Sequence, residues 1–468
     1  YSGHDSLFID EIGNLHIRHR FGEIIEEAPT AWLEENHRKI QINFKLEGNN
    51  VRFDFPDGYD VSKTLIIDPT LTFSSYTGAT ADNWGMTATP DENGNLIAGG
   101  VIFGLGYPIT LGAFDSTFNA GNIDAVVTKF NANGTALLFS TYLGGSGEET
   151  TNSLVCNTNN EVFIFGLTSS ANFPMAGASF DVTFGGGPNV SFASNGLGFN
   201  AGTDLFIARL SSDGTTLIAS TYVGGSGTDG LNDSGLNYNY GDQFRGEIIV
   251  DDNGFVYVSS TTQSADFPTF QGTQGALSGS QDAVLFKMPE SLNSMVWSTF
   301  FGGTGIETGN SVQLASNGEV FIAGGTTSSS LPFVIGNDLN YGGNKDGYLA
   351  RFNGNNGSIL SGTYIGLGEY DQSYFVQLDV DDNVYVFGQT ESDLGITPGH
   401  YGTSNSGQFI RKYDQNLNTL LWKTMIGAGS GHVEISPTAF LVSDCYDIYF
   451  SGWGGSLNQA SQAFWYCP

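Results

Sequence analysis

The most regular charged residues in this 468-residue sequence are aspartates followed five residues later by a cation. The pairs are Asp124 and Lys129, Asp204 and Arg209, Asp282 and Lys287, and Asp346 and Arg351, and Lys412 holds the cation position of a fifth repeat. An odd spacing on a β-strand sends two side chains to opposite faces, so the two charges of a pair do not meet. Either the five cations form a ring that binds a ligand, or each meets an acid of a neighbouring repeat, with candidates Glu148, Asp229, Glu307 and Glu369. We predict the second, structural role for all five cations, each partly buried within about 4 Å of a carboxylate or carbonyl on its own or an adjacent blade.

Acidic turns form a second group of candidate residues, because convergent carboxylate oxygens bind calcium. Asp251 lies in the turn DDNG, and Asp379 and Asp381 lie in DVDDN. None of these turns has the spacing and distal glutamate of an EF-hand loop. Hairpin turns of this kind form without a metal. We therefore expect no cofactor, and calcium at these three aspartates is the alternative.

Common catalytic motifs do not occur in the sequence. There is no H-E-x-x-H, G-x-S-x-G or G-x-x-x-x-G-K-[ST] pattern, and the six histidines are scattered, so no catalytic residue is assigned. Carboxylates from different repeats can still converge on a common axis, which keeps glycoside cleavage open. Trp453 lies among small residues in SGWGGS and is a candidate platform for stacking a sugar ring. The alternative is that Trp453 belongs to the core, as expected for most tryptophans of the repeats.

Three cysteines limit the available sulfur chemistry. No C-x-x-C pair occurs, so neither a zinc ribbon nor a redox motif is indicated. Cys445 precedes an expected strand and Cys467 lies one strand further on, so we predict a disulfide between them in an oxidising compartment. Cys156, in the apolar sequence NSLVCN, is predicted to be a buried free thiol.

A repeated unit supplies the elements that must position these residues. Its most regular part occurs six times, as LTFSSYTG at Leu71, LLFSTYLGG at Leu137, LIASTYVGG at Leu217, MVWSTFFGG at Met295, ILSGTYIGLG at Ile359 and LLWKTMIGAG at Leu420. Further apolar runs follow each copy, separated by turns such as DENGN, DDNG and SSDG that favour hairpins. Each unit is therefore predicted to be an antiparallel meander of four strands, the first unit beginning at Leu71 and the last ending near Cys467.

A four-stranded sheet with two apolar faces cannot bury both alone, whereas successive sheets packed around an axis bury them. A solenoid is the alternative, but its units usually have about 20 to 50 residues and lack four hairpin-linked strands. We predict an all-β fold in which residues 69–468 form a β-propeller of four-stranded antiparallel blades. Six repeats are visible, and we expect about six to eight blades in a longer parent protein, with the C-terminus truncated here. Residues 1–68 do not fit the repeat and are predicted to form a small, incomplete β-sandwich-like domain.

Composition narrows the class of partner. With 16 Lys and Arg against 48 Asp and Glu, the net charge of −32 repels nucleic acid and anionic membranes. No apolar run of about 18 residues occurs, so no membrane span is predicted. Two inserts rich in Gly, Asn and aromatic residues, 174–203 and 227–244, interrupt the second and third repeats. Loops on a rigid scaffold carry binding, so both inserts are candidate binding segments, although a neutral insertion is the alternative.

The repeat phrases FSTYLGGSGEE at Phe139 and STFFGGTGIE at Ser298, and the strand endings SSANFP at Ser169 and QSADFP at Gln263, resemble the SBBP repeat of seven-bladed β-propeller type. The segments YDVSKTLIIDPTLTFSSYTG at Tyr59 and CYDIYFSGWGGSLN at Cys445 are similar to large Bacteroidota surface proteins of the type IX secretion and gliding-motility-associated class. The resemblance covers nearly the whole chain. It implies a propeller scaffold and export, and it implies no catalytic residue.

These observations predict a non-catalytic scaffold or adhesion module at the cell surface or outside the cell. It is expected to bind protein or glycan partners, and other subunits of a surface complex, through its loops. The alternatives are a propeller enzyme acting on polysaccharide, either a lyase or a glycosidase, and a subunit of the gliding or secretion apparatus. A carboxylate pair of perturbed pKa in a central cleft would favour the enzyme. A channel lined by Gly, Ser and Thr would favour the scaffold.

Overall fold

The computed structural model describes residues 6–19, 22–33, 35–48, 50–68, 77–192, 197–232, 234–239 and 241–454. The chain divides into two compact units, Tyr1–Tyr76 and Thr77–Pro468. The predicted all-β fold is confirmed, because the regular structure of the described ranges is strand apart from two short 3₁₀ helices, η1 (Ser234–Leu236) and η2 (Asp242–Phe244). None of the described helices is long and apolar enough to cross a membrane.

The first unit consists of three small antiparallel sheets. The first sheet has strands β1 (Ser6–Ile9), β2 (Leu15–His19) and β3 (Gly22–Glu26), and the second has β5 (Lys39–Ile40), β4 (Thr30–Leu33) and β8 (Leu65–Asp68). The third is the hairpin of β6 (Asn43–Glu47) and β7 (Asn50–Asp54). The main apolar cluster of the first unit is small and consists of Ala31, Leu33, Ile40 and Ile42.

The second unit contains five four-stranded antiparallel sheets, which are the predicted blades. Blade 1 comprises β9 (Asn83–Pro90), β10 (Leu96–Ile102), β11 (Asp124–Phe130) and β12 (Leu137–Leu143). Blade 2 comprises β13 (Glu149–Cys156), β14 (Val162–Thr168), β17 (Asp204–Leu210) and β18 (Leu217–Val223), with a small inserted hairpin of β15 (Val190–Ser191) and β16 (Gly198–Phe199). Blade 3 comprises β19 (Glu247–Val250), β20 (Phe255–Thr262), β21 (Asp282–Pro289) and β22 (Trp297–Phe301).

The remaining sheets continue the same order of strands. Blade 4 comprises β23 (Ser311–Leu314), β24 (Val320–Thr326), β25 (Asp346–Phe352) and β26 (Ile359–Ile365). Blade 5 comprises β27 (Asp371–Leu378), β28 (Val384–Thr390), β29 (Gln408–Tyr413) and β30 (Leu420–Ile426). A two-stranded sheet of β31 (Ile435–Val442) and β32 (Ile448–Gly454) follows blade 5.

The phase of the repeat differs from the prediction by one strand. The apolar run that was predicted to open each unit forms the fourth strand of a blade, as β12 and β18 do, and not its first strand. The Gly-rich turn after this run leads to the first strand of the next blade, so one sequence repeat is shared by two blades. Leu71 and Cys467, the predicted limits of the repeats, lie outside the described residues. The blade number and the closure of the ring therefore stay predictions.

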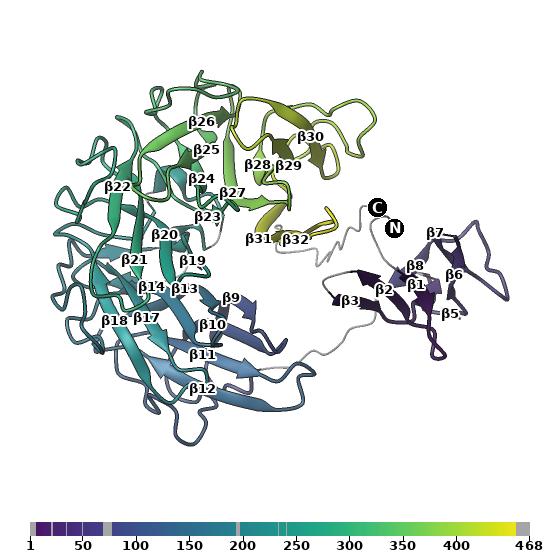
Figure 1. The fold of residues 1–468 in the computed structure, drawn as a ribbon, viewed down its shortest axis with the longest axis horizontal. Helices are drawn as coiled ribbons and strands as arrows, with labels where there is room; N and C mark the ends of the chain where they lie inside the picture. The colour runs from purple at the N-terminus through teal and green to yellow at the C-terminus, as the bar shows by residue number, and fades with distance from the viewer. Residues whose placement is uncertain are drawn as a thin grey trace. The chain divides into compact units, whose positions relative to one another are not determined.

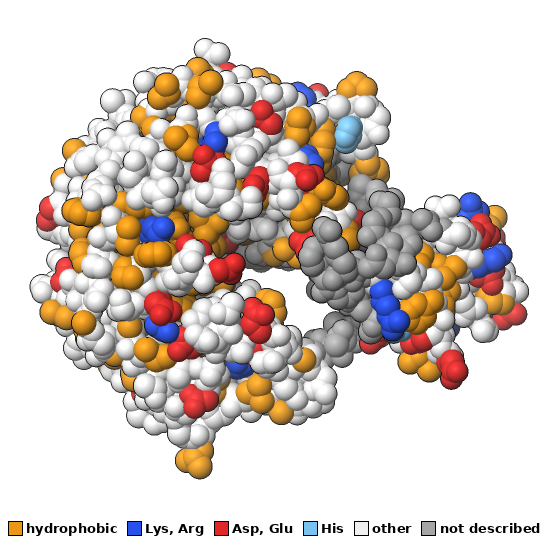
Figure 2. All heavy atoms as spheres, viewed as in Figure 1, with side chains coloured by type: hydrophobic (Ala, Val, Ile, Leu, Met, Phe, Trp, Pro, Cys, Tyr) orange, Lys and Arg blue, Asp and Glu red, His pale blue; other side chains and the backbone are white. Residues whose placement is uncertain are grey.

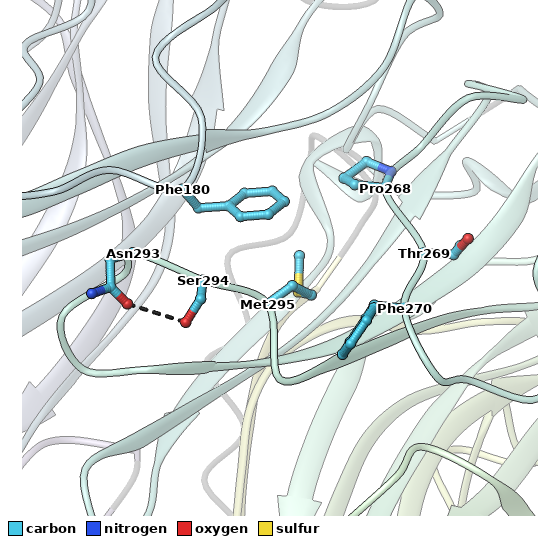
Figure 3. A pocket seen from close by; sticks show the side chains of 7 residues that line it. All are labelled: Phe180, Pro268, Thr269, Phe270, Asn293, Ser294 and Met295. Carbon is cyan, nitrogen blue, oxygen red and sulfur yellow. Dashed lines mark hydrogen bonds between the residues drawn. The ribbon is translucent and has the colours of Figure 1, made fainter.

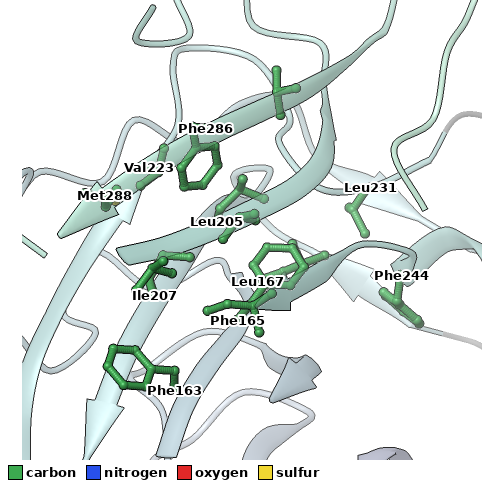
Figure 4. Packing of buried hydrophobic residues seen from close by; sticks show 14 of the residues in the cluster. Phe163, Phe165, Leu167, Leu205, Ile207, Val223, Leu231, Phe244, Phe286 and Met288 are labelled. Atoms are coloured by element: carbon green, nitrogen blue, oxygen red, sulfur yellow. The ribbon is translucent and has the colours of Figure 1, made fainter. Parts of the chain in front are cut away.

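The blades follow one another along an arc, with their first strands toward the middle (Figure 1). Consecutive first strands contact each other, from β9 and β13 to β27 and β31. The core lies between blades. Phe163 and Phe165 of blade 2 belong to one buried cluster with Phe286 and Met288 of blade 3 (Figure 4). Full burial of such a side chain contributes about 1.5 to 3 kcal/mol, so stacking of the blades supplies what a single sheet lacks.

Candidate functional site

The insert between blades 2 and 3 crosses the arc of first strands at the end where those strands begin. We call residues 227–246 the crossing segment. Asn239 donates its side-chain amide to Gln389 Oε1 of blade 5 at 2.9 Å. Arg245 Nη2 donates to the carbonyl of Pro437 in β31 at 3.1 Å. The segment therefore joins blade 3 to blade 5 and to the sheet that follows it.

Asp242 fixes the conformation of the crossing segment. Its side chain is buried, and its Oδ2 accepts the backbone N–H groups of Tyr238 at 3.1 Å and Asn239 at 2.6 Å. The Tyr374 hydroxyl of β27 donates to the same oxygen at 2.8 Å. Arg245 donates Nη2 to Asp242 Oδ1 at 2.9 Å and lies 4.7 Å from the centre of the Tyr374 ring. These donors and the guanidinium balance the aspartate charge, so Asp242 holds the crossing segment against β27.

Tyr238 is a solvent-exposed aromatic residue of the crossing segment, with 44% of its surface exposed. Its ring stacks on the buried Tyr370 ring, with centroids 4.1 Å apart and an interplanar angle of 16°. Its hydroxyl donates to Glu391 Oε1 at 2.7 Å. The backbone N–H of Glu391 donates to the carbonyl of Tyr370 at 2.8 Å, so the carboxylate and the stacking partner are held together.

Burial and the Glu391 carboxylate raise the pKa of Tyr238 to about 12. The phenol is therefore protonated at neutral pH, and its proton lies on the hydrogen bond to a carboxylate that can accept it. The ammonium of Lys345 lies 6.0 Å from the Tyr370 ring centre and adds a positive charge near the pair. A phenol paired with a carboxylate is suited to proton transfer and, once deprotonated, to nucleophilic attack.

A channel of about 470 Å³ is lined by the first strands of the five blades and by β31. Its polar lining residues are Thr87, Thr89, Ser153, Glu247, Gln313 and Gln377. Glu247 accepts the Ser311 hydroxyl at 2.6 Å and the Val312 N–H at 2.8 Å, and burial raises its pKa to about 7. Glu247 is the one carboxyl among the described lining residues. The channel therefore does not hold the carboxylate pair that would mark a central catalytic cleft.

A groove of about 300 Å³ lies between the insert of blade 2 and the loops of blade 3 (Figure 3). Its lining is mainly apolar and includes Phe180, Phe270 and Met295. The Ser294 hydroxyl donates to Asn293 Oδ1 at 3.1 Å beside it. No described lining residue is titratable, so the groove offers contact area but no acid or base.

The five predicted cations lie at equivalent positions on the third strands of their blades. The strand that carries Lys412 differs only in that it does not begin with an aspartate. Four form ion pairs: Lys129 with Asp91 at 2.8 Å, Arg209 with Glu161 at 2.5 Å, Arg351 with Glu319 at 2.7 Å, and Lys412 with Asp379 at 2.7 Å. Figure 2 shows Lys and Arg side chains at intervals along the arc, several beside acidic side chains.

The partners of these cations differ from the predicted ones, because they lie in the turn between the first two strands of the same blade. The predicted acids Glu148, Asp229, Glu307 and Glu369 follow the Gly-rich turns at the opposite end of the blade, where each third strand begins. Lys287 has no carboxylate within ion-pair distance among the described residues. Its ammonium donates to the carbonyl of Gly354 at 3.3 Å and lies 4.2 Å from the centre of the Phe255 ring.

The predicted calcium turns have protein donors on their carboxylates. Asp251 Oδ1 accepts the N–H groups of Asn253 at 2.9 Å and Phe255 at 2.8 Å. Asp379 binds the Lys412 ammonium, and Asp381 accepts the Tyr446 hydroxyl at 2.8 Å. Within the described ranges, no group of three or more potential metal ligands is found. Calcium at these turns stays a prediction, and the donors already present weaken it.

The remaining predicted residues lie near the C-terminus and in blade 2. Trp453 lies in β32 opposite Ser436, and its side chain is outside the described part of the structure, as is Cys467. Cys445 is exposed in the turn before β32, so its disulfide to Cys467 stays a prediction. Cys156 is only partly buried, and this burial raises the pKa of its thiol to about 12.

Comparison with known proteins extends the description of the fold. Residues 1–70 match the family described as Domain of unknown function (DUF7948), and no curated protein matches the chain. An ulvan lyase of polysaccharide lyase family PL25 is 12% identical, with a TM-score of 0.42 and coverage of 81% of both chains. The NanB sialidase from Streptococcus pneumoniae is 10% identical, with a TM-score of 0.44 and coverage of 97% of this chain and 87% of that chain. The β-propeller domain of the Trilobed protease from Pyrococcus furiosus is 6% identical, with a TM-score of 0.37 and coverage of 81% and 79%.

The prediction that the chain is not an enzyme is corrected by these comparisons. It rested on the propeller scaffold and on absent motifs, yet two of the three structures are enzymes, a polysaccharide lyase and a sialidase. Tyr238 and Glu391 were not predicted from the sequence, because they are 153 residues apart and meet only in the folded arc. The available signal was the aromatic sequence NYNYGD within the predicted insert 227–244.

Proposed function

We propose that this protein is a carbohydrate-active propeller that cleaves glycosidic bonds of an uncharged polysaccharide at Tyr238 and Glu391. The observation that carries the proposal is the hydrogen bond from an exposed tyrosine to a carboxylate, held by a segment that spans several blades. Sugar rings stack on aromatic faces, and the outer face of the Tyr238 ring is available while its inner face is covered by Tyr370. The same residue thus supplies a binding surface and a reactive oxygen.

The pair can perform hydrolysis in two balanced steps. Glu391 accepts the phenol proton as Tyr238 Oη bonds to the anomeric carbon, and the bond from that carbon to the leaving oxygen breaks. The proton on Glu391 passes to the leaving oxygen. Water then attacks the anomeric carbon, Glu391 takes its proton, and the Tyr238 phenolate leaves and recovers that proton.

The charge of the protein favours an uncharged substrate. The net charge of −32 repels an anionic polymer, and the reactive pair itself contains a carboxylate. Arg245, a nearby positive charge, is already neutralised by its ion pair with Asp242. A neutral polymer avoids the repulsion and still gains stacking and hydrogen bonds.

The proposal is tested by measuring new reducing ends released from starch, cellulose, xylan, mannan and β-1,3-glucan, with polygalacturonate as a charged comparison. Tyr238→Phe removes the reactive oxygen and keeps the ring, and Glu391→Gln removes the proton acceptor. Each should lower kcat by about 100-fold or more. Tyr446→Phe is the matched control, because Tyr446 also donates its hydroxyl to a carboxylate but lies in the turn before β32. Its activity should equal that of the unchanged protein.

Three results would overturn the proposal. The first is that no polymer yields new reducing ends, and the second is that polygalacturonate alone yields them. The third is that Tyr238→Phe keeps its activity. Circular dichroism and thermal unfolding of each variant establish that a lost activity does not reflect a lost fold.

We also propose that the protein acts outside the cell, at the cell surface or released from it. What supports this is the resemblance of its repeats to exported SBBP-type proteins and the extracellular location of most structural polysaccharides. Detection of the protein only in the cytoplasmic fraction of its source would contradict this location.

A further inference from the structure

Four blade junctions contain a pair of buried carboxyl groups. One member is the aspartate that begins the third strand of a blade, and the other is the acid at the start of the next blade. The pairs are Asp124 and Glu149, Asp204 and Asp229, Asp282 and Glu307, and Asp346 and Asp371. None of the eight side chains is more than 1% exposed. No Lys or Arg within the described ranges forms an ion pair with any of them.

The second member of each pair is well supplied with donors, as Glu149 illustrates. Its Oε1 accepts the hydroxyls of Thr168 at 2.6 Å and Ser170 at 2.5 Å, and its Oε2 accepts the Gly145 N–H at 3.1 Å. Asp371 likewise accepts the hydroxyls of Thr390 and Ser392 and a backbone N–H. Three donors stabilise the ionised form of a carboxyl group, but burial outweighs them here and raises the pKa of Glu149 to about 7 and that of Asp371 to about 6.

The first member differs between junctions. In the first and fourth junctions, Oδ2 of the aspartate accepts a backbone N–H, from Asn119 to Asp124 and from Gly342 to Asp346, each at 2.6 Å. The backbone N–H of Gly343 also lowers the pKa of Asp346. Oδ1 of each of these two aspartates is buried and has no hydrogen-bond partner. In the second junction, both oxygens of Asp204 accept backbone N–H groups.

The unpartnered oxygens lie close to the other carboxyl of their pair, as the distances from a shared glycine show. A Cβ on Gly144 would lie 3.0 Å from Asp124 Oδ1 and 2.7 Å from Glu149 Oε2. A Cβ on Gly366 would lie 2.5 Å from Asp346 Oδ1 and 3.0 Å from Asp371 Oδ2. The two oxygens of each pair therefore lie beside the same glycine, where any larger residue would contact both carboxyl groups.

A buried anionic oxygen without a donor, facing a second carboxylate, carries a large energetic penalty. A proton on that oxygen removes one charge and turns the acceptor into a donor aimed at the ionised partner. We propose that Asp124 and Asp346 bind a proton in the folded protein at neutral pH, each donating from Oδ1 to the ionised carboxylate across the blade junction. This inference does not depend on the proposed function.

The surrounding charges favour the bound proton. Asp124 faces the carboxylates of Glu149 and Asp115, and burial followed by these charges raises its pKa to about 7. Asp346 faces Asp371 and Asp338, with the neutral phenols of Tyr341 and Tyr364 nearby, and burial raises its pKa to about 7. Burial raises the pKa of Asp371 to about 6, and Arg411, the one described cation that acts on either pair, opposes this rise only in part.

The linkage has a definite sign. A carboxyl group whose pKa is raised by folding contributes stability that is complete below about pH 4 and is lost as pH rises toward 7. The blade junctions should therefore lose stability as pH rises from about 4 to about 7.

The test compares Asp124→Asn and Asp346→Asn with the unchanged protein in denaturant unfolding at about pH 5 and about pH 8.5. An amide accepts the backbone N–H through its oxygen and donates to the partner carboxylate without needing a proton. Between the two pH values, the unfolding equilibrium constant of the unchanged protein should rise at least about tenfold more than that of each variant, because each pKa unit is worth a factor of ten. Asp204→Asn is the comparison: it loses an acceptor for Gly185 or Gly186 and should be destabilised at both pH values. Because burial raises the pKa of Asp204 only to about 6, its pH dependence should fall less than that of the other two variants.

Infrared spectra give a second measurement that does not require unfolding. The unchanged protein at neutral pH should show a carboxylic acid C=O band that loses intensity in Asp124→Asn and Asp346→Asn. Equal pH dependence of the variants and the unchanged protein would overturn the proposal. So would a melting temperature at about pH 8.5 that rises with millimolar CaCl₂, falls with EDTA and loses this response in Asp124→Asn, because a bound cation would then hold the pair.

Discussion

Replacement of Lys129 by methionine tests the role of the repeated cations. The Lys129 ammonium lies 2.8 Å from Asp91 Oδ2, and the two side chains are 6% and 0% exposed. Burial alone would raise the pKa of Asp91, but Lys129 and the donors of Asn95 and Asn93 outweigh it and lower the pKa to about 2. A decrease from 3.8 to about 2 corresponds to roughly 2.4 kcal/mol of stability at neutral pH.

We expect Lys129→Met to lower the free energy of unfolding by about 2 to 4 kcal/mol at pH 7, because a buried carboxylate loses its counter-ion. Since folding lowers the pKa of Asp91, its contribution is present above about pH 4 and is lost as pH falls through 2. Urea unfolding at several pH values measures the difference. Lys287→Met is the matched control, because Lys287 holds the same repeat position with a carbonyl in place of an ion-pair partner. Equal losses in the two variants would refute the reasoning, as would no loss in Lys129→Met.

Two further predictions concern the glycines and the thiols. Gly144→Ala should lower the free energy of unfolding by about 1 to 3 kcal/mol in urea, because its Cβ would lie 2.7 Å from Glu149 Oε2, whereas Gly275→Ala meets nothing within 4 Å and should be nearly neutral. A large loss in Gly275→Ala alone would contradict this explanation of the Gly-rich turns. If Cys445 and Cys467 form a disulfide, thiol titration of the unfolded, unreduced protein finds one free group, that of Cys156. Three free groups would rule the bridge out.

Much of the fold is predictable from the sequence because its information is local. The repeated phrase at Leu137 and its five relatives carries strand and turn signals within a few residues, and these define the blades. Which strand of a blade each repeated phrase forms, in contrast, depends on contacts far apart in the sequence. LLFSTYLGG fits an outer or an inner strand equally well, and the choice depends on which strands pack in the middle of the arc.

The candidate site depends on contacts that no repeat describes. The cation positions could be found from their spacing, but the partner of Lys129 could not, because both ends of each blade carry acids. Tyr238 lies in an insert without a repeat equivalent, and Glu391 follows an ordinary second strand. Only the curvature of the blades brings a residue from between blades 2 and 3 to blade 5. The unpartnered oxygens of Asp124 and Asp346 are equally invisible, since Asp204 and Asp282 have the same sequence signature.

A crystal structure of Glu391→Gln with an oligosaccharide of the cleaved polymer tests the central claim most directly. The variant should bind the oligosaccharide without hydrolysing it. We predict a sugar ring against the exposed face of Tyr238, with an anomeric carbon about 3 to 3.5 Å from its hydroxyl oxygen. A sugar bound only in the groove of Phe180, Phe270 and Met295, or only in the channel beside Glu247, would contradict it.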